Sequence, residues 1–287
     1  MRSALVPPKS ISIPAIDLDQ IDAATFQTRY VDPGRPVLLR GAMKNWAALG
    51  RWQDPEYLAE AAGERVIYAA DPANGDRTQL PLKDLWRGIF AEGGAKFSSI
   101  NASINTKGQS GILGNLTSDT KLGPFLPHAH HVSTKVFAGY NTRCGLHLHP
   151  DTEAYLCQVV GKKRVILFPP DDWNHIYPAN WYSPYVSFSK AHFARDGQWP
   201  DFGEFPQLAK THPMECVVEP GDMLYIPIYW WHVVWGLGAA ICVTQFFRSS
   251  LSKRFMTRSG LRCNYLNRVG GMRLRLQMRK RGLTAGV

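Results

Sequence analysis

The sequence predicts a mainly β protein whose sheet folds back on itself, and three stretches support this. Residues 147–153 carry potential metal ligands at every second position, and such positions share one face of an extended strand. Residues 155–168 contain two short apolar runs around Gly161, which predict a hairpin. Residues 219–236 contain a turn, a strand and His232. Ligands near residue 148 and near residue 232 can meet only if distant strands lie together.

The hairpin prediction depends on the composition of the second stretch. Tyr155 to Val160 and Arg164 to Phe168 are apolar runs, and Gly161-Lys162-Lys163 between them is typical of a turn. In the third stretch, Pro220-Gly221-Asp222 predicts a turn and Met223 to Ile228 a strand.

The N-terminal half predicts helices that support the sheet. Asp54 is a favourable N-cap, Pro55 suits the first helical position and Gly63 suits the position past the end. Apolar spacing and turn residues predict the other elements. These are a loose arm at 1–12 ending in a strand-like Ile11-Ser12-Ile13, a helix over 22–30, a strand over 37–39, and a helix over 80–90.

Two segments, 101–128 and 171–212, show little regular pattern. We expect long loops there, and substrate contacts often come from such loops near the mouth of a site. Plain surface loops are the alternative.

Composition fits one compact globular unit in a reducing compartment. The 287 residues are 45% hydrophobic and 20% charged, which is typical of a globular chain. The sequence has no apolar run of about 18 residues, and its first ten residues lack a signal-peptide core. Its five cysteines are scattered and odd in number, which argues against a disulfide framework. We therefore expect a cytoplasmic protein without a membrane span.

The alternating residues and the distant histidine together predict a metal centre. A single histidine on an apolar strand usually has another role. Here His147, His149, Asp151 and Glu153 alternate, and His232 follows an aromatic cluster. Two histidines and a carboxylate with open positions form the facial arrangement used by non-haem Fe(II).

The same residues carry a family resemblance. The stretches NTRCGLHLHPDTEAYLCQVVGKKRVILFPPDDW, VVEPGDMLYIPIYWWHVV and AAICVTQFFR resemble the JmjC or cupin-like Fe(II)- and 2-oxoglutarate-dependent oxygenases, in particular the asparaginyl-hydroxylase-like branch. The resemblance covers roughly residues 10 to 250. It implies a double-stranded β-helix with flanking α-helices. It also implies Fe(II), 2-oxoglutarate as co-substrate, and hydroxylation of an unactivated C–H bond.

The resemblance leaves three sets of metal ligands open. The family motif is H-x-D or H-x-E, and one register places His147 first with His149 at the carboxylate position. A second register uses His149 and Asp151 and shortens the following loop. A general cupin signature would use His147, His149, Glu153 and His232. Loops tolerate insertion more easily than deletion, which favours a site that includes His147.

The resemblance also assigns co-substrate contacts. Lys163 matches the basic residue that pairs with the far carboxylate of 2-oxoglutarate, a charge-assisted contact. Lys162 beside it is expected to be a solvated turn residue. Gln245 falls where relatives carry a polar residue near the co-substrate, and Cys144 stands where the family has a threonine.

The C-terminal segment has a distinct composition. Residues 249–287 carry ten basic and no acidic residues, so the net charge of +10 lies there and the rest is balanced. We expect a catalytic domain over 1–250, with an N-terminal helical buttress, and a basic, helical tail over 251–287. The tail could attract an anionic partner or form a homodimer. It lacks the alternation of arginine and aromatic residues that stacks bases, so nucleic acid is not the expected partner.

The sequence therefore predicts an Fe(II)- and 2-oxoglutarate-dependent hydroxylase acting on a peptide or protein side chain. Two alternatives remain: a cupin-like binding protein without oxygenase activity, and a metal-dependent cupin enzyme that does not use 2-oxoglutarate.

Overall fold

The structure is a computed structural model that describes residues 6–70, 77–91, 93, 99–179, 187–265 and 272. The strands are β1 (Ile11–Ser12), β2 (Ala15–Asp17), β3 (Val37–Arg40), β4 (Val66–Ala70), β5 (Arg77–Pro81), β6 (Ser99–Thr106), β7 (Gln109–Ser110), β8 (His131–Tyr140), β9 (Arg143–His147), β10 (Thr152–Phe168), β11 (Met214–Val218), β12 (Met223–Ile226) and β13 (Trp231–Arg248).

The helices are short. The α-helices are α1 (Ala23–Phe26), α2 (Ala48–Arg51), α3 (Pro55–Ala62), α4 (Leu82–Phe90), α5 (Leu251–Phe255) and α6 (Arg258–Gly260). Short helices of 3-10 or π type are η1 (Leu18–Gln20), η2 (Gln27–Val31), η3 (Gly114–Asp119), η4 (His128–His130), η5 (Pro170–Asn174), η6 (Pro206–Lys210) and η7 (Leu261–Tyr265).

Two long strands, β10 and β13, organise the fold. They pair antiparallel from Thr152 opposite Arg248 to Phe168 opposite Trp231. The first half of β10 also pairs with β12 and its second half with β11, whereas β13 pairs with β9 near its start and with β8 near its end. Each long strand thus pairs with two different strands in succession along its other edge, and this arrangement confirms the predicted double-stranded β-helix.

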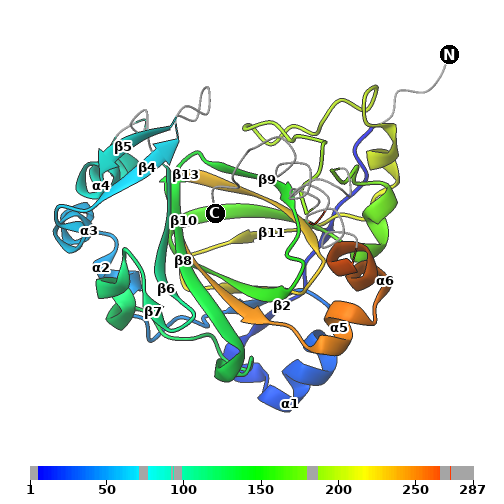
Figure 1. The fold of residues 1–287 in the computed structure, drawn as a ribbon, viewed down its shortest axis with the longest axis horizontal. Helices are drawn as coiled ribbons and strands as arrows, with labels where there is room; N and C mark the ends of the chain where they lie inside the picture. The colour runs from blue at the N-terminus through cyan, green and yellow to red at the C-terminus, as the bar shows by residue number, and fades with distance from the viewer. Residues whose placement is uncertain are drawn as a thin grey trace.

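The remaining strands widen the barrel. Among the described residues, eleven strands belong to one sheet, whose main path is β2-β3-β12-β10-β13-β8-β6-β7. The β4–β5 hairpin is separate from it. In Figure 1, α3, α4 and this hairpin lie outside the barrel on one side, and α5 and α6 lie on the opposite side. The helices therefore flank the barrel as expected.

The predicted N-terminal elements are confirmed with small shifts. The Asp22 carboxylate accepts from Thr25 N at the start of α1, and the Asp54 carboxylate accepts from Glu56 N at the start of α3. The predicted strand at 37–39 is β3, and the arm does end in a strand, since β1 pairs with β11. The helix predicted over 80–90 begins at Leu82, because the two preceding residues belong to β5.

The predicted hairpin at 155–168 is wrong, because this segment is the single strand β10. The ladder with β13 shifts register between Gln158 and Val160 and again between Val160 and Lys162. Gly161 has φ +63°, and a Cβ there would lie 2.0 Å from Ala239 O. A glycine within a strand that bulges has the same local signature as a turn glycine.

The loop predicted over 101–128 is wrong at its start. β6 and β7 form a hairpin whose turn residues, Lys107 and Gly108, have φ values of 50° and 77°. Positive φ at both turn positions is the conformation that two-residue hairpins prefer. The described part of 171–212 is irregular as predicted, with only η5, η6 and isolated bridges.

Candidate metal centre

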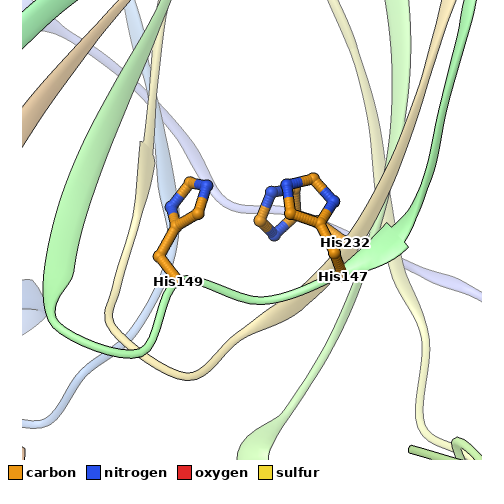
Figure 2. A group of neighbouring side chains, drawn as sticks. All are labelled: His147, His149 and His232. Atoms are coloured by element: carbon orange, nitrogen blue, oxygen red, sulfur yellow. The ribbon is translucent and has the colours of Figure 1, made fainter. Parts of the chain in front are cut away.

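Three histidines from two strands and the loop after β9 converge inside the barrel. His147 at the end of β9 pairs with His232 at the start of β13. One ring nitrogen from each of His147, His149 and His232 lies within 4.8 Å of the other two. Figure 2 shows the rings turned toward a common space, with His149 facing His147 and His232.

The local sequence explains why the first two histidines face inward. Leu146 and Leu148 are each 2% exposed and pack in an apolar cluster with Trp231. Because successive side chains of an extended chain point to opposite faces, burying these leucines turns His147 and His149 to the other side. The alternation that predicted convergence therefore produces it.

Hydrogen bonds orient two of the rings for metal binding. His147 Nδ1 lies 2.8 Å from Gly145 O, and His232 Nδ1 lies 3.0 Å from Trp230 O. Carbonyl oxygens only accept, so both Nδ1 atoms donate, and in the neutral form of each ring Nε2 keeps a lone pair. His149 Nδ1 is buried and has no hydrogen-bond partner among the described residues. Such an atom is suited to a metal ion.

Burial keeps two of these rings neutral. It lowers the pKa of His149 to about 3, with smaller contributions from His147 and Lys135. Burial also lowers the pKa of His232 well below its usual value, helped by both other rings. The pKa of His147 is raised, because contacts with Cys144 and Gly145 outweigh burial, which lowers it. Neutral imidazole is the form that binds metals.

The structure does not bring Asp151 to the three rings. Among the described residues, the group that could hold a metal is His147, His149 and His232. Asp151 Oδ2 lies 3.7 Å from Arg248 Nη1 and is partly exposed. The register that pairs His149 with Asp151 therefore lacks geometric support.

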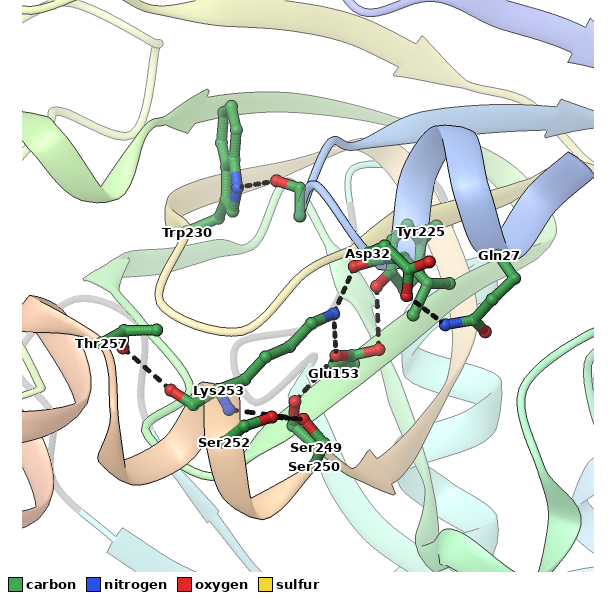
Figure 3. Close-up of polar contacts among 12 residues, drawn as sticks. Gln27, Asp32, Glu153, Tyr225, Trp230, Ser249, Ser250, Ser252, Lys253 and Thr257 are labelled. Carbon is green, nitrogen blue, oxygen red and sulfur yellow. Dashed lines mark hydrogen bonds and ion pairs between the residues drawn. The ribbon is translucent and has the colours of Figure 1, made fainter.

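Glu153 does not join the rings either. It is buried and accepts hydrogen bonds from Tyr225, Ser249 and Lys253 (Figure 3). The signature of three histidines and one glutamate is therefore not assembled.

Lys163 lines the same cavity as the three histidines, and this cavity is partly open to solvent. The cavity has a volume of about 280 Å³. Lys163 is 5% exposed, and its Nζ lies 3.2 Å from Phe137 O and 2.8 Å from Cys242 Sγ. Of the described residues that line the cavity none is a carboxylate, and none forms an ion pair with Lys163. A buried ammonium without a counter-ion is costly, so this cavity is suited to an anion.

The two other predicted co-substrate contacts, Cys144 and Gln245, lie in different surroundings. Cys144 lines the cavity, with its sulfur 3.7 Å from His147 Nδ1. Gln245 does not line it: its side chain accepts from Gly123 N and donates to Lys121 O, both at 2.7 Å.

Sequence reasoning missed several polar residues of the cavity, namely Asn101, Thr142, Arg143 and Thr244. Thr244 and Gln245 are adjacent on β13, so they face opposite sides of the sheet. His232 on β13 pairs with His147 and faces the cavity, so other even-numbered residues of β13 face it too. This register could not be known from the sequence.

The double-stranded β-helix of this chain, with histidines in its interior, fits the cupin-like class of proteins. Residues 23–253 match the family model described as a cupin-like domain, and the chain belongs to this JmjC and cupin-like family. Enzymes of the JmjC group use Fe(II) and 2-oxoglutarate as oxygenases.

Curated relatives support this membership. The chain is 29% identical over 238 residues to Jumonji C domain-containing protein 5 of Drosophila melanogaster, covering 76% of this chain and 56% of the relative. It is 26% identical to arginine-specific demethylase JMJ22 of Arabidopsis thaliana, with 80% of this chain and 45% of the relative covered. It is also 26% identical to human bifunctional peptidase and (3S)-lysyl hydroxylase JMJD7, with 77% and 80% covered.

The first two relatives are about twice as long as the segment that this chain matches. None of these three relatives is named as an asparaginyl hydroxylase, and that branch stays a prediction. Among the described residues, no helix is both long and apolar enough to cross a membrane.

Proposed function

We propose that the protein is an Fe(II)- and 2-oxoglutarate-dependent oxygenase that hydroxylates a C–H bond of a peptide or protein side chain. The observation that carries this proposal is the shared cavity, in which His147, His149 and His232 lie with the buried ammonium of Lys163. Relatives named as a lysyl hydroxylase and an arginine demethylase act on protein side chains, which supports the substrate class.

Each cavity residue has a distinct role in this proposal. The three histidines hold the metal through neutral imidazole nitrogens. When bound, Fe(II) and 2-oxoglutarate supply an oxidant strong enough for an unactivated C–H bond. Lys163 donates to the far carboxylate of 2-oxoglutarate and so fixes the direction of the co-substrate. Apolar residues of the lining, such as Leu156, Ile226 and Val234, exclude water from the reacting groups.

The imidazole of His149 changes the charge of the centre. A metal held by neutral ligands keeps its full double charge, whereas a carboxylate ligand would reduce it. Attraction between opposite charges is strong where water is excluded. We therefore expect the dianion of 2-oxoglutarate to compensate both the metal and Lys163.

The direct test measures whether 2-oxoglutarate is consumed and succinate released when Fe(II), O₂ and candidate peptides are present. Binding is measured separately by calorimetry under anaerobic conditions. Lys163→Ala should weaken 2-oxoglutarate binding by about 1.5–3 kcal/mol, the range for a hydrogen bond to a charged group. Unchanged affinity for 2-oxoglutarate in this variant would mean that Lys163 does not bind the co-substrate.

Lys162→Ala is the matched control. Its ammonium pairs with Glu219 at 2.6 Å on the surface, where an ion pair contributes little. This variant should bind 2-oxoglutarate as the unmodified protein does.

A second candidate function is a metal-dependent cupin enzyme that does not use 2-oxoglutarate. The observation that favours it is the set of imidazoles without a carboxylate among the described ligands. Under this alternative, substrate oxidation proceeds at full rate without 2-oxoglutarate. A protein that binds metal and ligand without turnover would instead be a cupin-like binding protein.

A further inference from the structure

A second hollow with basic walls lies beside the end of β13. This basic groove, of about 570 Å³, includes Lys107, His130, His131, Arg248 and Arg254 among its lining residues. None of the described residues that line it is a carboxylate. Lys107, His130 and Arg248 are exposed, so their charge or polarity is presented to solvent.

The basic groove adjoins the metal cavity along β13. Phe246 lines the cavity, and its ring centroid lies 5.1 Å from that of His149. Arg248 lines the groove two residues later on the same strand. Two residues of an extended strand span about 7 Å, and their side chains share one face. A chain that lies in the groove is therefore adjacent to the cavity.

A buried network holds Ser249, one of the residues that line the groove (Figure 3). Ser249 Oγ donates to Glu153 at 2.8 Å, and Lys253 Nζ lies 3.1 Å from the same carboxylate. Burial raises the pKa of Tyr225 well above its usual value, so the phenol stays protonated and donates to Glu153. A lining residue that is already held in place reduces the ordering cost of binding.

Lys107, another residue that lines the groove, is also held in place. Lys107 occupies the hairpin turn between β6 and β7, and its backbone N donates to Val132 O at 2.7 Å. Its side chain therefore projects from a defined position.

We propose that the basic groove binds acidic side chains of the peptide or protein substrate and so holds the substrate chain across the metal cavity. This inference rests on the proposed function and adds a substrate class to it, a segment rich in Asp or Glu beside the hydroxylated residue. Asp151 pairs with Arg248 only at 3.7 Å, so the guanidinium can also engage a substrate carboxylate.

Charge alone would also suit nucleic acid, but the lining favours a peptide. The described residues that line the groove include no Phe, Tyr or Trp. Proteins that bind single strands without sequence preference stack bases on aromatic side chains. Carboxylates need only the basic groups that the groove supplies.

The test uses the full-length chain and a fluorescein-labelled oligoglutamate peptide, followed by fluorescence anisotropy at low ionic strength. Lys107→Gln should weaken binding roughly threefold, and the double variant Lys107→Gln with Arg248→Gln roughly tenfold. The control double variant Lys9→Gln with Lys44→Gln removes two exposed charges elsewhere and should bind as the unmodified protein does. High salt should abolish the binding.

Several results would overturn the inference. Equal losses in the groove and control variants would mean that net charge alone attracts the peptide. Tighter binding of oligothymidylate that depends on Lys107 and Arg248 would assign the groove to nucleic acid. The binding of 2-oxoglutarate with Fe(II), measured on the same variants, should not change. If the unmodified protein does not bind 2-oxoglutarate with Fe(II), the proposed function is contradicted. The result for peptide binding in the groove would still hold in that case.

Discussion

His149 distinguishes this centre from a ligand set of two histidines and a carboxylate, because an imidazole stands where the family motif has Asp or Glu. Its ring lies 4.7 Å from that of His232 between centroids. Asp151, the nearest alternative carboxylate in sequence, faces Arg248 instead. The ligand set can therefore be resolved by single substitutions.

We expect His147→Ala, His149→Ala and His232→Ala each to weaken metal binding by at least about 100-fold. Loss of residues that only support a ligand already costs about 10-fold to 100-fold. Calorimetry with Mn(II) measures the affinity, and circular dichroism checks folding. Asp151→Ala is the matched control and should retain metal. Loss of metal in that variant together with full binding in His147→Ala would restore the register of His149 and Asp151.

The sequence predicted the histidines of this site better than its other polar residues. Alternation places His147 and His149 on one face whatever the strand pairs with, so this part needs no tertiary information. Gln245 could not be assigned in that way, since an error of one residue in the register of β13 turns every side chain to the other face. The structure shows that Thr244, not Gln245, lines the cavity.

Gln245→Ala should therefore affect stability more than co-substrate binding. Its removal leaves Gly123 N and Lys121 O without their side-chain partner, which costs about 1–3 kcal/mol for a buried group. Chemical denaturation measures the loss. Gln198→Ala, at an exposed position, should stay within about 0.5 kcal/mol. A stable Gln245→Ala protein that no longer binds 2-oxoglutarate would return Gln245 to the site.

At the scale of elements, β10 shows where sequence patterns fail. The flanking runs of this strand and its central glycine fit both a hairpin and a bulged strand locally. What decides between them is the pairing with β13 along the whole length of β10, and these partners are far apart in sequence. The capped helix α3 was predictable because its start and end depend on adjacent residues.

Gly161→Ala tests the bulge. The added methyl would meet Ala239 O at 2.0 Å, and the positive φ is unfavourable for alanine. We expect a loss of about 2–4 kcal/mol in the free energy of unfolding, from strain and displaced backbone. Gly50→Ala in α2 has open space around it and should be neutral or stabilising by up to about 1 kcal/mol. Equal stability of both variants would contradict the bulge as described.

At the scale of the whole molecule, the basic C-terminal segment begins within the fold. Tyr229 donates to Arg254 O at 3.0 Å, and Cys263 is buried in the cluster that contains Trp231. The family match also continues past residue 250, to residue 253. The domain boundary at 250 and a homodimer through this segment stay predictions, and residues 266–271 and 273–287 lie outside the described residues.

Lys253 connects this segment to two distant parts of the chain. Its Nζ donates to Val31 O in η2 and lies 3.1 Å from Glu153 Oε1 in β10 (Figure 3). The Glu153 side chain is 5% exposed, so removal of the ammonium would leave a buried carboxylate with only neutral donors. Breaking a buried ion pair from one side is strongly destabilising.

We therefore expect truncation after Ser250 to lower the melting temperature strongly. Lys253→Met should lower the free energy of unfolding by about 2–3 kcal/mol, a moderate loss because the lysine is partly exposed. Truncation after Met272 removes five of the basic residues without touching the described segment and is the matched control. Melting curves at low and high salt distinguish a tail that only attracts acidic substrate from a tail whose first helix, α5, is part of the fold. If the tail only attracts acidic substrate, both truncations should melt like the intact protein and raise the apparent KM at low salt alone. If α5 is part of the fold, the first truncation should be unstable at every salt concentration.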